Sequence, residues 1–111
     1  MDFEEAASKA LAFREEREWS QFHNPKDLAI SINLEAAELL EIFQWSGTDL
    51  MVASKTDKAK EEIADVVIYC IYMADKLGIN LADAVSEKID INSKKYPVEK
   101  SKGSSRKYTE L

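Results

Sequence analysis

Two glutamates on the apolar face of one predicted helix constrain the fold of this chain more than any other feature. The segment Leu34–Trp45 (LEAAELLEIFQW) contains Glu35 and Glu38, and their spacing places them about 60° apart around a helix axis. The apolar stripe of this helix consists of Leu28, Ile32, Leu39, Ile42 and Phe43. Glu35 projects from the middle of the stripe, and Glu38 lies at its edge. Because a buried carboxylate is costly unless it is paired, protonated or bound to a metal, the fold must bring a compensating group to this face.

The composition indicates a single domain that is nearly all-α. The chain has 111 residues, of which 45% are hydrophobic and 32% charged, and only three Gly and two Pro interrupt a sequence rich in helix formers. A net charge of −6 argues against binding to a nucleic-acid polymer. Cys70 is the single cysteine, so no disulfide framework is expected. Without a signal-peptide pattern or an apolar run of about 20 residues, we expect a cytoplasmic protein that does not contact membranes.

Four helices are expected, over residues 2–18, 25–45, 58–77 and 81–95. The third is apolar around most of its circumference, which in so small a chain indicates contact with another subunit as well as with the chain's own core. We therefore expect a helical bundle domain over residues 1–97 that forms a homo-oligomer, and a polar tail over residues 98–111.

A second acidic pair lies on the third predicted helix, at Glu62 and Asp65. Two facing helices that each carry acids at positions i and i+3 can form a cage of four carboxylates, whose hard oxygen ligands suit Mg²⁺ or Mn²⁺. Phosphate oxygens can complete the coordination of such ions. The alternative is a solvated acidic cluster at the start of a helix, but two such pairs on two amphipathic helices favour the metal cage.

The fourth predicted helix supplies groups suited to phosphate. Lys88 and Asn92 fall on the same stripe as Leu81 and Val85, where apolar side chains would be expected. A lysine at the edge of a core can extend to solvent, which is the structural alternative. Beside a cage of metal and carboxylates, an inward Lys and Asn would bind a polyphosphate.

Aromatic residues form a third candidate group. Trp19 lies in a break between helices, Trp45 at a helix end, and Tyr69 between the directions of Glu62 and Asp65. Together they can form a slot that stacks on a planar base, although aromatic residues at helical spacing more often belong to a core. His23, the only histidine, is either a pocket residue or a core or capping residue. Two further aromatic side chains are expected in the core, Phe22 and Phe43.

Two other kinds of site are disfavoured by the motifs. A di-iron carboxylate bundle needs a Glu-x-x-His motif on each of two helices, and the chain has a single histidine that does not follow a glutamate at that spacing. No GxxxxGK[ST] or GxGxxG sequence is present, which excludes phosphate binding by a glycine-rich loop of those types.

With both acidic pairs located, the chain resembles the MazG-like all-α nucleoside triphosphate pyrophosphohydrolases, and within them the dCTP pyrophosphatases. The family signature, ExxE followed by ExxD, is present as Glu35-Ala36-Ala37-Glu38 and Glu62-Ile63-Ala64-Asp65. The supporting segments are ERxWxQFHxPxxL at 16–28, ELxEIFQW at 38–45, KIDIN at 88–92, KYP at 95–97 and SSRKYTEL at 104–111. The match covers nearly the whole chain.

The resemblance implies a four-helix protomer that assembles into a homotetramer, a dimer of dimers, with shared active sites. It implies Mg²⁺ binding by Glu35, Glu38, Glu62 and Asp65. In the mechanism that we expect, one of two glutamates, Glu35 or Glu38, also accepts a proton, and the sequence does not distinguish between them. It implies phosphate and sugar contacts for Lys88 and Asn92, and a base pocket at or beside Trp19, His23, Trp45 and Tyr69. Ala10 departs from the family pattern, in which a polar residue or His is frequent.

The expected reaction is hydrolysis of dCTP, or of base-modified dCTP, to dCMP and pyrophosphate, which removes unwanted nucleotides from the pool. One alternative is a pyrophosphatase of broader specificity that acts on dUTP or other dNTPs. The other is a non-catalytic helical oligomer, in which the four acids form ion pairs with Arg14, Arg17 or Lys58.

Overall fold

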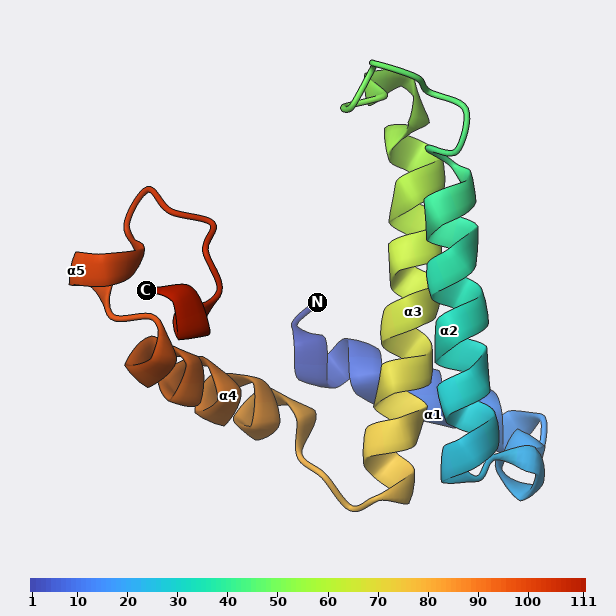
Figure 1. Cartoon of the computed structure of the whole chain (residues 1–111). Helices are drawn as coiled ribbons and strands as arrows, with labels where there is room; N and C mark the ends of the chain where they lie inside the picture. The colour runs from blue at the N-terminus through green and yellow to red at the C-terminus, as the bar shows by residue number, and fades with distance from the viewer. The chain divides into compact units, whose positions relative to one another are not determined.

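The computed structural model describes all 111 residues and contains only helices and connecting loops (Figure 1). The elements are α1 (Phe3–Glu16), η1 (Trp19–Phe22), α2 (Pro25–Glu41), η2 (Ala53–Lys55), α3 (Thr56–Lys76), α4 (Leu81–Lys95), α5 (Val98–Ser101) and η3 (Tyr108–Glu110). The all-α prediction is confirmed. The chain divides into two compact units, Met1–Gly78 and Ile79–Leu111. None of the helices combines the length and the apolar character that crossing a membrane requires.

Helix α2 begins where the sequence predicts and ends earlier. The side chain of Asn24 accepts a hydrogen bond of 2.9 Å from the backbone N–H of Asp27, and Pro25 occupies the first helical position. The expected end at Trp45 is wrong, because α2 ends at Glu41. Beyond it the backbone tightens into i→i+3 turns, with bonds of 3.0 Å from Phe43 N–H to the Leu40 carbonyl and of 3.3 Å from Gln44 N–H to the Glu41 carbonyl.

Helices α2 and α3 lie side by side, joined at one end by the loop that contains η2 (Figure 1). Helix α3 begins at Thr56, two residues before the expected start, and ends one residue early, at Lys76. Gly78 follows with φ 67°, a left-handed conformation that favours glycine and lets the chain turn away. The most deeply buried residues are Leu28 of α2 and Ile71, Tyr72 and Ala74 of α3.

Helix α1 packs against α3 and begins with a capping box. The backbone N–H of Glu5 donates to the side chain of Asp2 at 2.8 Å, and the Asp2 N–H donates to the Glu5 carboxylate at 3.3 Å. Segment η1 packs on α1 through Trp19. The predicted core position of Phe22 is wrong: its side chain is 65% exposed, because α1 contacts this segment at Trp19.

The second unit, Ile79–Leu111, contains α4, α5 and η3. Asn80 caps α4 by accepting a 3.0 Å hydrogen bond from the backbone N–H of Asp83. The residues expected as a polar tail, 98–111, contain two short helical segments. Tyr108 packs edge-on against Tyr96 at 5.9 Å between ring centroids, so this segment folds onto the end of α4. A division of the chain after Pro97 stays a prediction.

Candidate functional site

The four predicted acids come together on the facing sides of α2 and α3. Glu35 and Glu38 project from α2, and Glu62 and Asp65 project from α3. One carboxylate oxygen from each residue lies within 4.8 Å of those of the other three. Glu38 is exposed, and the other three side chains are half-buried. The i, i+3 spacing on each helix and the pairing of the two apolar stripes therefore produce the predicted cluster.

The electrostatics of the cluster favour a bound cation. Oε2 of Glu35 and Oε2 of Glu62 are buried without a hydrogen-bond partner. None of the four acids takes part in an ion pair within 4.0 Å, and the ion pairs of Arg14 and Arg17 go to other acids.

Burial and the neighbouring carboxylates raise the pKa values of two acids of the cluster, Glu35 and Glu62. Burial, and then the neighbouring Glu38, Asp65 and Glu62, raise the pKa of Glu35 from 4.5 to about 7. Burial and then Glu38 also raise the pKa of Glu62. Four mutually repelling carboxylates with unpartnered oxygens are a donor set that fits hard divalent ions such as Mg²⁺ or Mn²⁺.

An aromatic cavity of about 600 Å³ adjoins the cluster and shares Glu35 and Asp65 with it. The walls come from α1, η1 and α3, with Glu35 contributed by α2. The lining residues are Met1, Phe3, Ala6, Lys9, Ala10, Phe13, Trp19, Glu35, Ala64, Asp65, Val67, Ile68, Tyr69, Ile71 and Tyr72. A largely apolar pocket that ends at carboxylates can hold a planar group at one side and a cation-bound anion at the other.

Two of the predicted base-pocket residues, Trp19 and Tyr69, line this cavity. Trp19 packs edge-on against Phe13, with ring centroids 5.6 Å apart. His23 lies behind the wall, where its ring is 6.5 Å from that of Tyr69 and 5.2 Å from that of Tyr72. Burial, and then the positive charge of Arg14, lower the pKa of His23, so the imidazole is neutral near pH 7.

The other three predicted site residues lie elsewhere. Trp45 follows α2, is 89% exposed, and does not line the cavity. Lys88 and Asn92 lie on α4 in the second unit, where Lys88 is exposed and Asn92 is half-buried. The roles of these three residues stay predictions.

Arg14 and Tyr72 are two buried residues near the cavity whose positions were not predicted. Arg14 is only 5% exposed and pairs with Asp75 of α3 rather than with the acid cluster. Tyr72 is 3% exposed and lines the cavity. The sequence does contain a pattern that points to Tyr72, since Tyr69, Tyr72 and Asp75 follow one another at three-residue intervals along α3 and so lie toward one side of it.

Comparison with known proteins assigns the family. The model of the MazG-like family matches residues 30–111, a range that includes both acidic pairs. The chain belongs to the MazG-like family.

Individual relatives agree with this assignment. The dCTP pyrophosphatase 1 proteins of Homo sapiens and Mus musculus are 39% and 38% identical to the chain over 104 residues. These alignments cover 89% of the chain but 61% of each relative, so the chain spans about three fifths of their length. The crystal structure of a pyrophosphatase from Archaeoglobus fulgidus DSM 4304 superposes with a TM-score of 0.77 at 42% identity, covering 85% of this chain and 91% of that one.

Proposed function

We propose that this protein is a Mg²⁺-dependent nucleoside triphosphate pyrophosphohydrolase that converts dCTP, and base-modified dCTP, to dCMP and pyrophosphate. The observation that carries the proposal is the cluster of four carboxylates within 4.8 Å, which shares Glu35 and Asp65 with the aromatic cavity. The two features match the two ends of a nucleotide, since a triphosphate needs cations and a base needs a flat apolar slot. The names of the relatives, dCTP pyrophosphatase 1, support cytosine as the base.

In this proposal Glu35, Glu38, Glu62 and Asp65 hold the metal, with Mn²⁺ as an alternative ion. Bound Mg²⁺ supplies positive charge that neutralises the carboxylates and the triphosphate, and it lowers the pKa of water. The carboxylates fix where that charge lies. Glu35 or Glu38 accepts the proton of the water that attacks the α-phosphorus, and pyrophosphate leaves.

The substrate would be held at both ends. Trp19 and Tyr69 line the cavity and would contact the base, His23 would support the Tyr69 ring, and Trp45 would complete the pocket in the assembled protein. Lys88 and Asn92 would bind the phosphates and the sugar. A slot of this kind can discriminate between bases, whereas the acids contact only the phosphate end.

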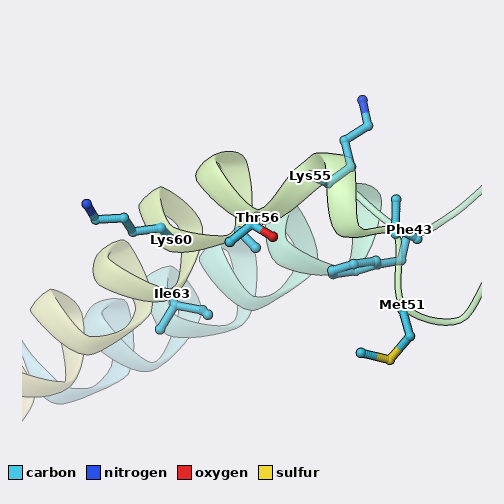
Figure 2. A pocket seen from close by; sticks show the side chains of 8 residues that line it. Phe43, Met51, Lys55, Thr56, Lys60 and Ile63 are labelled. Atoms are coloured by element: carbon cyan, nitrogen blue, oxygen red, sulfur yellow. The ribbon is translucent and has the colours of Figure 1, made fainter.

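We further propose that the protein is a homotetramer, a dimer of dimers, built from four-helix protomers. Large apolar side chains around the loop after α2 support an interface there: Trp45, Leu50 and Met51 are each more than 80% exposed. Beside them a pocket of about 380 Å³ is lined mainly by Phe43, Met51, Val52 and Ile63. Figure 2 shows the labelled Lys55 and Lys60 extending away from this apolar wall, so a partner subunit would meet an apolar centre with a charged rim.

We also propose that the protein is located in the cytoplasm. Nucleotide substrates and a lone cysteine both favour this location.

The test is release of pyrophosphate from each of the four dNTPs, dUTP and 5-methyl-dCTP, with and without Mg²⁺. We expect Mg²⁺-dependent release that is fastest with the two cytosine nucleotides. Equal release from all bases would replace cytosine specificity with a broad dNTP pyrophosphatase activity. No release from any nucleotide would favour a non-catalytic helical oligomer. The Glu38→Gln variant should lose activity, with the exposed Glu61→Gln variant of α3 as the matched control.

A further inference from the structure

The cavity lies between α1 and α3, so its width depends on how far apart these helices are. Helix α1 contributes Ala6, Ala10 and Phe13, which share one face of that helix. Helix α3 contributes Tyr69 and Tyr72 among others. A shift of α1 would change the shape of the cavity, whereas the four acids lie on α2 and α3.

Two polar side-chain contacts join α1 to α3. Nη2 of Arg14 donates a hydrogen bond of 2.8 Å to Oδ2 of Asp75. The hydroxyl of Tyr72 donates a hydrogen bond of 3.1 Å to the carbonyl of Ala10. Because this carbonyl also lies one helical turn before Arg14, both contacts fix the same turn of α1.

The guanidinium of Arg14 is buried and held in one position by its neighbours. The residue is 5% exposed, and its Nη1 atom is buried without a hydrogen-bond partner. Nε of Arg14 also donates a hydrogen bond of 2.8 Å to the Glu15 carboxylate, so the buried guanidinium is held between a carboxylate of α1 and the Asp75 carboxylate of α3. The guanidinium carbon lies 5.5 Å from the centroid of the Tyr72 ring, so the charge also rests against a wall residue of the cavity.

Tyr72 in turn packs against two neighbouring aromatic side chains, Tyr69 and His23. Its ring is 5.9 Å from that of Tyr69, nearly perpendicular at 88°, and 5.2 Å from that of His23. Arg14 and His23 do not line the cavity themselves. Both lie against Tyr72, which does line it.

We infer that Arg14 and Asp75 are positioning residues and Tyr72 a specificity-determining residue, which together fix the α1–α3 wall of the cavity and so set its selectivity between bases. This inference rests on the proposed function for the identity of the ligand. The acids that would act on the phosphates lie apart from these contacts, so loss of the contacts should weaken selection of the base and leave turnover intact.

The kinetic test compares KM and kcat for dCTP and dTTP in wild-type protein, Tyr72→Phe and Asp75→Asn. Loss of one hydrogen bond should raise KM for dCTP by about three- to tenfold, change kcat by less than about twofold, and lower the preference for dCTP over dTTP. Asp75→Glu, which keeps the carboxylate, should recover most of the preference. Asp57→Asn, an exposed acid of the same helix, is the matched control and should not change it.

A second readout does not depend on hydrolysis. In a Trp45→Phe background Trp19 is the only tryptophan, and it lines the cavity. Quenching of its fluorescence by acrylamide should increase in Tyr72→Phe and in Asp75→Asn, and should return toward the wild-type value in Asp75→Glu. If the wild-type protein hydrolysed no nucleotide, the proposed function would fail, and this measurement would still decide whether the contacts hold the wall.

A merely structural role gives a different pattern. It would lower the melting temperature and reduce kcat alike on every nucleotide, with the preference for dCTP and the quenching of Trp19 unchanged. That pattern, in the mild Tyr72→Phe variant as well as in Asp75→Asn, would overturn the inference.

Discussion

Replacing Glu35 by Gln should stabilise the metal-free protein, and more at alkaline than at acidic pH. Glu35 has a pKa of about 7 in the folded chain, against an ordinary value of 4.5, with burial as the largest cause and the Glu38 carboxylate as the next. The unfolded chain releases this proton near pH 4.5, whereas the folded chain keeps it until about pH 7. The free energy of unfolding therefore falls as the pH rises through this window, and the loss is complete above it.

The size of the effect follows from the pKa and the exposure of the side chain. For a fully buried group such a rise in pKa would correspond to about 3 kcal/mol. Glu35 is only half-buried, so solvent screening reduces the expected effect to about 1 kcal/mol. Glutamine has nearly the same shape and carries no charge, so Glu35→Gln should gain that amount at pH 8 and only about a quarter of it at pH 5. For a chain of this size the gain at pH 8 corresponds to a rise in melting temperature of roughly 4 °C.

The assay is thermal unfolding followed by circular dichroism, in EDTA, at one fixed protein concentration, at pH 5 and pH 8. Glu61→Gln removes the same charge from an exposed position of α3 and is the matched control. An equal shift of the melting temperature at both pH values, or a lower stability of Glu35→Gln than of the wild-type protein at pH 8, would contradict a raised pKa of Glu35 in the folded chain.

Two other predictions concern the metal and the core. At pH 8, excess Mg²⁺ should raise the melting temperature of the wild-type protein, because in the proposed function the four acids of the folded state would bind it and the unfolded chain would not. The rise should be much smaller in Glu62→Gln, and an equal rise in both proteins would argue against a metal site at the cluster. Leu28→Ala should lower the free energy of unfolding in urea by about 3 kcal/mol, because the Leu28 side chain is 1% exposed and its removal leaves a cavity. The exposed Lys26→Ala, on the same helix, should change it by less than about 0.5 kcal/mol, and similar losses in both variants would contradict the burial argument.

The starts of α2 and α4 could be predicted because the information that sets them is local. Asn24 and Asn80 each cap a helix through the backbone N–H three residues ahead, and the two helices begin at the predicted residues, Pro25 and Leu81. The end of α2 could not be placed as well. The segment from Ile42 to Trp45 continues the apolar pattern of the helix, yet its backbone forms i→i+3 turns. Hydrophobic periodicity does not distinguish these two hydrogen-bonding patterns over a single turn.

The acid cluster could also be predicted, because two short-range regularities are sufficient for it. Each pair shares a helix face through its i, i+3 spacing, and each helix must turn that face toward the other to bury its apolar stripe. The proximity of Glu35 and Glu62 can therefore be predicted without knowing the conformation of the loop that joins α2 and α3.

The contact between Arg14 and Asp75 has no such regularity, since 61 positions separate the two residues. Composition made Arg14 a candidate partner for the acid cluster. Its position on α1, beside the C-terminal half of α3, gives it a different partner.

The aromatic cavity shows where helical periodicity stops being informative. Tyr69 was selected because it points between the directions of Glu62 and Asp65, and it does line the cavity. Tyr72 lines the same cavity from nearly one turn further along α3. A helical projection records the angle of a side chain around the axis and discards its position along that axis. The extent of the cavity along α3 depends on where α1 packs against it, and the contacts of Tyr72 with Ala10 and of Asp75 with Arg14 determine that position. The acids that would bind the metal can therefore be predicted from the sequences of α2 and α3 taken separately. The wall that would select the base cannot, because it forms only when a third helix, α1, packs against α3.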